Sequence, residues 1–135
     1  MHQLGLQLSA HLRAGDLLLV NGPLGAGKTV LAQGIGQGLG VTGVTSPTFV
    51  ISRVHKAAIP FIHVDAYRLL DSENPNLYLD DLDLDIATSI TLIEWGGTES
   101  ARLSEDRLEI TIDRAEDQRK VEINPIGSRW SGFSL

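Results

Sequence analysis

Residues 22–29, Gly-Pro-Leu-Gly-Ala-Gly-Lys-Thr, have the residue types and the spacing of a phosphate-binding loop. Glycines let such a loop turn so that consecutive backbone N–H groups point inward toward phosphate oxygens. Lys28 would bring a positive charge to the β- and γ-phosphates of a nucleotide, and the Thr29 hydroxyl would reach Mg²⁺. The motif therefore predicts that the chain binds a nucleoside triphosphate.

The motif also has the flanking elements that it requires. Residues 17–20, Leu-Leu-Leu-Val, form a continuous apolar run typical of a strand buried on both faces. From Lys28 onward, apolar residues at helical spacing predict a helix of about a dozen residues, whose first N–H groups would face the phosphates. A chance glycine-rich turn would not explain the strand, the loop and the helix together. Three glycines inside this helix, at positions 34, 36 and 38, each cost about 1 kcal/mol relative to alanine, so the helix must depend on packing or on a ligand.

Two acidic residues follow apolar stretches and are candidates for metal binding and catalysis. Residues 61–65, Phe-Ile-His-Val-Asp, end in Asp65, and residues 90–94, Ile-Thr-Leu-Ile-Glu, end in Glu94. A nucleotide site of this kind needs one carboxylate for Mg²⁺ and a group that positions the attacking water. The spacing does not say which residue has which role.

The elements that must position these residues follow an α/β pattern. Leu4, Leu8 and Leu12 recur at helical spacing, and a stop is expected at Gly15. Strands are predicted over residues 48–52, 59–65 and 89–95, and a hairpin with alternating apolar residues over 107–113 and 119–124. Because no stretch resembles a linker, we expect one α/β domain over residues 1–135.

Composition narrows the class of protein. The 135 residues include no cysteine, which excludes disulfides and thiolate metal sites. The net charge of −6, with an acidic run at residues 80–85, disfavours direct binding of nucleic acid. The start of the chain lacks a secretory pattern, and no apolar stretch approaches the length of a membrane span. A cytoplasmic protein is expected.

Missing motifs disfavour several nucleotide-binding classes. The chain has no Asn-Lys-x-Asp stretch for reading guanine and no Leu-Ser-Gly-Gly stretch of an ABC ATPase. A small-molecule kinase normally adds an acceptor pocket and an arginine-bearing lid, for which 135 residues leave little room.

Four stretches together resemble one family. They are residues 22–29, the Thr-Ser-Pro-Thr-Phe of 45–49, the His-Val-Asp-Ala-Tyr-Arg-Leu of 63–69, and the Ile-Glu-Trp of 93–95. Their order and separation are similar to those of the TsaE family (formerly YjeE), the bacterial P-loop ATPases of tRNA threonylcarbamoyladenosine biosynthesis. The resemblance extends over nearly the whole chain.

The resemblance implies a single P-loop NTPase-like α/β domain with a mixed β-sheet flanked by helices, and it implies ATP and Mg²⁺ as ligands. Asp65 matches the catalytic aspartate of the family, and Thr29 with Glu94 matches the Mg²⁺-holding pair. Residues matching the phosphate-binding positions are Leu24, Gly25, Ala26, Gly27, Lys28 and Thr29. The partners would be TsaD, which carries the transferase site, and TsaB, with tRNA contacted only through the complex and no membrane involved.

Two other functions remain open at this point. In one, the chain is a regulatory module in which bound ATP orders a docking surface. In the other, it is a small-molecule phosphotransferase.

Overall fold

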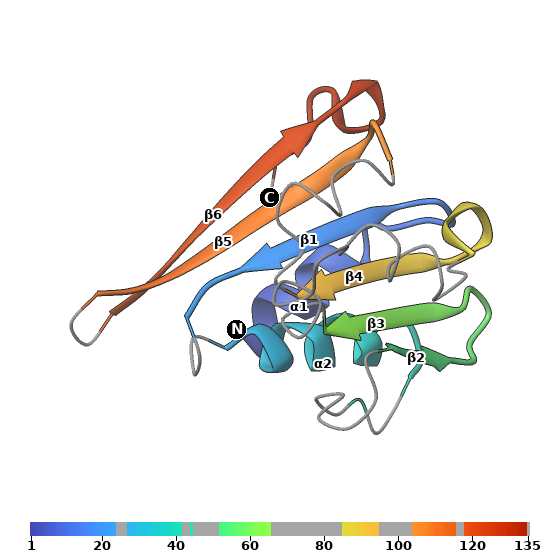
Figure 1. Ribbon diagram of the computed structural model, residues 1–135, viewed down its shortest axis with the longest axis horizontal. Helices are drawn as coiled ribbons and strands as arrows, with labels where there is room; N and C mark the ends of the chain where they lie inside the picture. The colour runs from blue at the N-terminus through green and yellow to red at the C-terminus, as the bar shows by residue number, and fades with distance from the viewer. Residues whose placement is uncertain are drawn as a thin grey trace, which may run out of the picture.

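The strands in the described part of the chain form one six-stranded sheet in the order β2-β3-β4-β1-β5-β6 (Figure 1). The computed structural model describes residues 1–23, 27–41, 44, 52–65, 85–94, 104–115 and 118–134. Strands β3, β4, β1 and β5 are parallel, while β2 and β6 pair antiparallel at the two edges. The bounds of the strands are β1 (Leu17–Asn21), β2 (Ser52–His55), β3 (Phe61–Asp65), β4 (Ile90–Glu94), β5 (Arg107–Ala115) and β6 (Gln118–Ile126). This mixed sheet confirms the α/β class predicted from the sequence.

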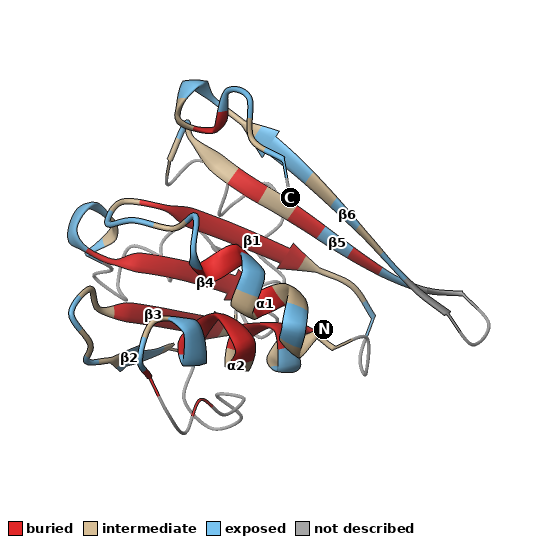
Figure 2. Cartoon of the chain, turned by 180° about the vertical axis from the view of Figure 1, so that it is seen from behind, coloured by how far each residue is buried: buried red, intermediate tan, exposed pale blue. Residues whose placement is uncertain are grey.

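Two α-helices, α1 (His2–Ser9) and α2 (Lys28–Gly38), lie on the same face of the sheet (Figure 2). Two short 3-10 helices, η1 (Ile86–Thr88) and η2 (Ser128–Trp130), precede β4 and follow β6. None of the described helices combines the length and the apolar character needed to span a bilayer.

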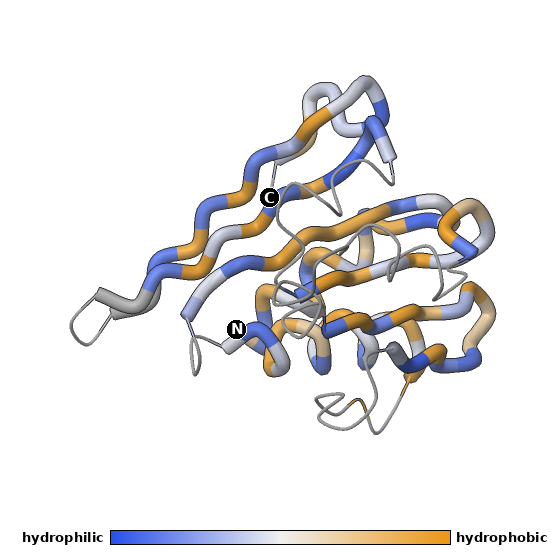
Figure 3. The backbone as a smooth tube through the Cα atoms, in the orientation of Figure 1, coloured by the Kyte–Doolittle hydropathy of each residue, from blue (hydrophilic) through white to orange (hydrophobic). Residues whose placement is uncertain are grey.

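Burial differs between the centre of the sheet and the β5–β6 hairpin. All four residues 17–20 of β1 are at most 1% exposed, so both faces of this strand are covered, as its continuous apolar run predicts. In β5, Leu108, Ile110 and Ile112 are fully buried, whereas the intervening side chains are half-buried or exposed. Figure 3 shows this alternation of apolar and polar residues along both strands of the hairpin. The hairpin thus contributes one apolar face to the core.

The first helix is shorter than its leucine spacing predicts. It ends at Ser9, not before Gly15, because the chain turns there: His11 N donates to Leu8 O and Leu12 N donates to Ser9 O. Leu12 still packs against the core from this turn, which explains why its position fits the helical pattern.

The strand predictions are correct in kind and differ at their ends. The edge strand β2 occupies residues 52–55, and the predicted strand residues 48–51 lie outside the described part of the chain. Strand β3 starts at Phe61, directly after Pro60, since proline has no N–H to donate. The predicted β5–β6 hairpin is confirmed and extends to Ala115 and Ile126.

Glycines in α1 and α2 allow these two helices to cross closely. A Cβ atom added to Gly34 would lie 2.2 Å from the backbone oxygen of His2, and one added to Gly5 would lie 2.5 Å from that of Leu31. These contacts are with backbone, which cannot rotate away as a side chain can. Packing against α1 therefore supports a helix whose composition makes it intrinsically weak.

We expect Gly34→Ala to lower the free energy of unfolding by about 1–3 kcal/mol, the usual effect of overpacking. Helix propensity alone predicts the opposite sign, with a gain of about 1 kcal/mol. Urea denaturation followed by circular dichroism measures the change. Gln37→Ala, at an exposed position of the same helix, is the control and should be nearly neutral. A stabilised Gly34→Ala variant would contradict the close crossing.

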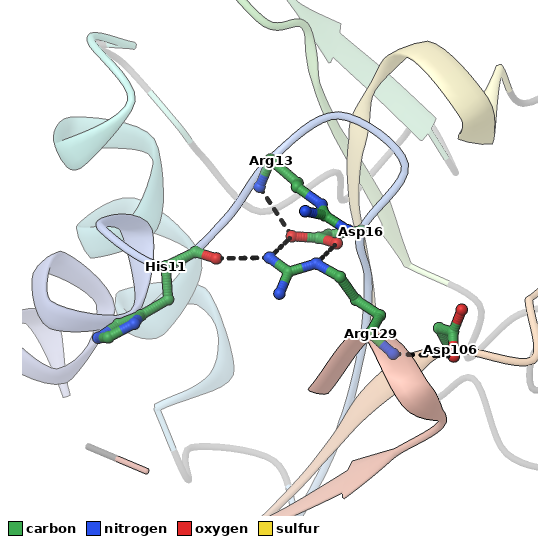
Figure 4. A network of polar contacts seen from close by, with 5 residues as sticks. All are labelled: His11, Arg13, Asp16, Asp106 and Arg129. Atoms are coloured by element: carbon green, nitrogen blue, oxygen red, sulfur yellow. Dashed lines mark hydrogen bonds and ion pairs between the residues drawn. The ribbon is translucent and has the colours of Figure 1, made fainter. Parts of the chain in front are cut away.

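A polar network joins the segment between α1 and β1 to η2 at the other end of the chain (Figure 4). Arg129 binds both carboxylate oxygens of Asp16, through Nε and Nη2, each at 3.0 Å. Nη2 also donates to His11 O, and Arg13 N donates to Asp16 Oδ2 at 2.7 Å. Asp16 is only 3% exposed, so its charge depends on these partners.

Candidate nucleotide-binding site

Asp65 and Glu94, two of the predicted site residues, lie side by side at the carboxyl edge of the parallel strands. Val20 of β1 pairs in register with Glu94 of β4, and Glu94 pairs with Asp65 of β3. The arrowheads of these three strands point to the same edge in Figure 1. Strand β1 lies between β4 and β5, so the order of the strands in the sheet reverses beside β1. In open α/β sheets, ligands usually bind outside the carboxyl ends of the strands at such a reversal.

Lys28, the first residue of α2, has its amine held above this edge. Nζ donates to Gly22 O at 2.7 Å and to Pro23 O at 2.9 Å, so the side chain folds back along the loop that precedes it. Burial lowers the pKa of Lys28, and the carboxylates of Glu94 and then Asp65 oppose that shift. The lysine and the two acidic residues therefore form one electrostatic unit, although they come from separate segments of the sequence.

The start of α2 has a glycine in a backbone conformation that other residues rarely adopt. Gly27 has φ of +108°, a left-handed conformation that favours glycine, and it precedes the helix without a capping side chain. The first N–H groups of α2 therefore receive no side-chain acceptor from their N-cap, and the positive end of the helix dipole faces this loop. Leu24, Gly25 and Ala26 lie outside the described residues.

The side chains of Thr29 and Glu94 offer oxygen atoms, the ligands that Mg²⁺ prefers. Thr29 is half-buried in the first turn of α2, and Glu94 is 4% exposed at the end of β4. Within the described ranges, no group of three or more His, Asp or Glu residues could hold a metal on its own. Mg²⁺ is commonly bound by one or two carboxylates together with substrate phosphates and water. A threonine hydroxyl and a glutamate carboxylate offer oxygen atoms of this kind, so the side chains of Thr29 and Glu94 fit that pattern.

His63 contacts Glu94, a pairing that the sequence analysis did not identify. The fully buried imidazole of His63 approaches Glu94 Oε2 through Nε2. His63 is thus packed inside the sheet in the middle of β3. The alternation of strand side chains puts His63 on the same face as Asp65, two residues later, but the sequence does not reveal that β4 is the neighbouring strand.

Several residues of the recognised motifs cannot be placed. Residues 45–50, residues 66–69 of the His-x-Asp-x-Tyr-Arg stretch, and Trp95 all lie outside the described chain. The same holds for residues 80–84 of the acidic run.

A mixed sheet has parallel central strands, and its first strand is followed by a helix that begins at a lysine. Together with the acidic residues that end strands β3 and β4, this arrangement is that of the P-loop class of fold. Within this class, a sequence model described as "Threonylcarbamoyl adenosine biosynthesis protein TsaE" matches residues 1–121. The chain belongs to the TsaE family.

Curated relatives and a solved structure agree with this assignment. The "tRNA threonylcarbamoyladenosine biosynthesis protein TsaE" of Streptomyces coelicolor is 47% identical, over 97% of this chain and 94% of its own. The protein of that name from Bacillus subtilis is 37% identical, over 90% of this chain and 77% of its own. A structure titled "Crystal structure of Bacillus subtilus YdiB" superposes with a TM-score of 0.73 and 29% identity, covering 96% of this chain and 82% of that one. The family assignment thus rests on sequence and fold alike.

Proposed function

We propose that this protein is the ATP-binding and ATP-hydrolysing component of the machinery that makes threonylcarbamoyladenosine in tRNA. It acts with TsaB and TsaD and does not transfer the threonylcarbamoyl group itself. The net charge of −6 supports indirect contact with tRNA through these partners. A cytoplasmic location belongs to the same proposal.

One observation carries the nucleotide-binding part of the proposal. Lys28, at the N-terminus of α2, lies close enough to the carboxylates at the ends of β3 and β4 for both to raise its pKa against the effect of burial. The lysine and the helix N-terminus attract phosphate, whereas Asp65 and Glu94 suit a divalent cation and an attacking water. Opposite charges arranged in this way match a triphosphate with its metal.

In the proposed reaction, some residues bind the nucleotide and its metal, and Asp65 transfers a proton. Lys28 and the backbone N–H groups would hold the phosphates. Thr29 and Glu94 would hold Mg²⁺, which would supply positive charge to the phosphates when bound. Asp65 accepts a proton from the attacking water while the oxygen of that water forms a bond to the γ-phosphorus. The bond from that phosphorus to the β–γ bridging oxygen then breaks, and ADP and inorganic phosphate leave.

The proposal is tested by measuring ATP hydrolysis by the isolated chain and by the chain mixed with TsaB and TsaD. A pull-down of both partners with and without ATP accompanies the assay. We expect slow hydrolysis by the isolated chain and faster turnover in the complex. ATP-dependent docking without turnover would favour a regulatory module, and phosphorylation of a metabolite by the isolated chain would favour a phosphotransferase.

We expect Lys28→Ala to weaken binding of ATP with Mg²⁺ by roughly ten- to a hundredfold, the range for losing a hydrogen bond to a charged group. Isothermal titration calorimetry measures the affinity. Lys120→Ala removes an exposed lysine of β6 and should leave binding unchanged. Equal affinities for Lys28→Ala and the unmodified protein would contradict the phosphate-binding role.

A further inference from the structure

The contact between His63 and Glu94 has a fixed direction. An ionised carboxylate only accepts hydrogen bonds, so Nε2 of His63 carries the hydrogen and donates it to Oε2 of Glu94. The other ring nitrogen, Nδ1, is buried and has no hydrogen-bond partner in the described structure. Glu94 is therefore the polar partner that accounts for an imidazole at this position.

Packing alone does not require a histidine there. His63 is 0% exposed in the middle of β3, its ring is stacked 6.4 Å from that of Phe61, and its register partner in β4 is Leu92. An apolar side chain in this place would avoid burying an unpaired nitrogen, which is unfavourable. What the imidazole adds to the site is a donor aimed at one oxygen of Glu94.

We propose that His63 is a positioning residue, which holds Oε2 of Glu94 so that the second oxygen, Oε1, is presented to the Mg²⁺ of a bound nucleotide. This inference rests on the proposed function, in which Glu94 is a ligand of that metal. Carboxylates that bind metals are themselves commonly held by hydrogen bonds, and loss of such an outer partner typically lowers metal affinity roughly ten- to a hundredfold. The backbones of β3 and β4 are paired in register at this end, so the side-chain torsions of Glu94 are what His63 must fix.

The test compares His63→Phe with His63→Gln in the full chain. Phenylalanine keeps a ring against Phe61 and removes the donor, whereas the terminal amide of glutamine places an N–H near the position of Nε2. The probe is the β,γ-imido analogue of ATP, whose binding is followed by calorimetry while Mg²⁺ is varied. We expect His63→Phe to raise the Mg²⁺ concentration at which binding of the analogue is half-maximal by roughly ten- to a hundredfold. His63→Gln should stay within a few-fold of the unmodified protein.

His55→Phe is a matched control. The ring of His55 stacks on the same Phe61 at 6.1 Å from β2, and its Nε2 is likewise buried without a partner in the described structure. His55 pairs in register with Phe61 at the far end of β3 from Asp65, so the Mg²⁺ requirement should not change. Should His63→Phe fail to fold, His63→Asn replaces it, because its shorter amide reaches only the Nδ1 position and should raise the Mg²⁺ requirement as well.

A second comparison tests whether His63 acts through Glu94. In a Glu94→Gln background, His63→Phe should cause no additional change in the Mg²⁺ requirement. An unchanged Mg²⁺ requirement in His63→Phe would overturn the positioning role. So would a His63→Phe effect of equal size in the unmodified protein and in the Glu94→Gln background. Absence of Mg²⁺-dependent binding in the unmodified protein would instead contradict the proposed function itself.

Discussion

Asp65→Asn should lower ATP hydrolysis by the complex with TsaB and TsaD by about 100-fold or more, the usual effect of losing a general base. Asparagine keeps the size of the side chain at the end of β3 but cannot accept the proton of the attacking water. Binding of ATP with Mg²⁺ should remain nearly intact, because Thr29 and Glu94 are the proposed ligands of the metal. Phosphate release at saturating Mg²⁺ measures the rate, and calorimetry measures binding.

Two variants separate this role from others. Glu94→Gln, at the neighbouring register position of β4, should chiefly change the Mg²⁺ requirement, since a neutral amide is a poorer ligand for a hard cation. Asp113→Asn removes an exposed carboxylate of β5 and should have no effect on turnover. If Asp65→Asn hydrolyses ATP at the unmodified rate, Asp65 is structural and another group activates the water.

Arg129→Met should lower the free energy of unfolding by about 3 kcal/mol, because it leaves the buried carboxylate of Asp16 without its charged partner. Methionine retains an apolar chain beside Trp130, over whose ring the Arg129 guanidinium lies at 4.0 Å. Of the hydrogen bonds to Asp16 described above, the one from Arg13 N would remain. Urea denaturation monitored by Trp fluorescence and circular dichroism measures the loss.

Arg107→Met is the matched control. Both arginine side chains are 19% exposed, but their carboxylate partners differ in exposure. The side chain of Glu109, which pairs with Arg107, is 33% exposed, whereas that of Asp16, which pairs with Arg129, is 3% exposed. Exposed ion pairs contribute about 0–1 kcal/mol, so Arg107→Met should be much milder. Adding Asp16→Asn to Arg129→Met should recover part of the lost stability. Equal losses for the two arginine variants would show that burial of Asp16 does not control the effect.

Sequence reasoning predicted the parts of the fold that depend on local patterns. The continuous apolar run of β1 predicts a strand covered on both faces, and the strand–loop–helix order around Lys28 predicts where α2 begins. Alternation along β5 and β6 predicts the hairpin. The end of α1 was predicted wrongly, because Leu12 fits the helical spacing while packing from a turn.

The sequence by itself determined which residues of the site could do chemistry: a lysine after a glycine-rich loop, and acidic residues after two apolar stretches. Only the tertiary structure decided which of them meet, because the order of strands depends on how the chain crosses the sheet. Placing β4 between β1 and β3 brings Glu94 level with Asp65 and within reach of His63. The same holds for Asp16 and Arg129, since a pairing across 113 positions leaves no periodic pattern in the sequence. Local periodicity reflects burial along one element, whereas the contacts between elements form only when the sheet assembles.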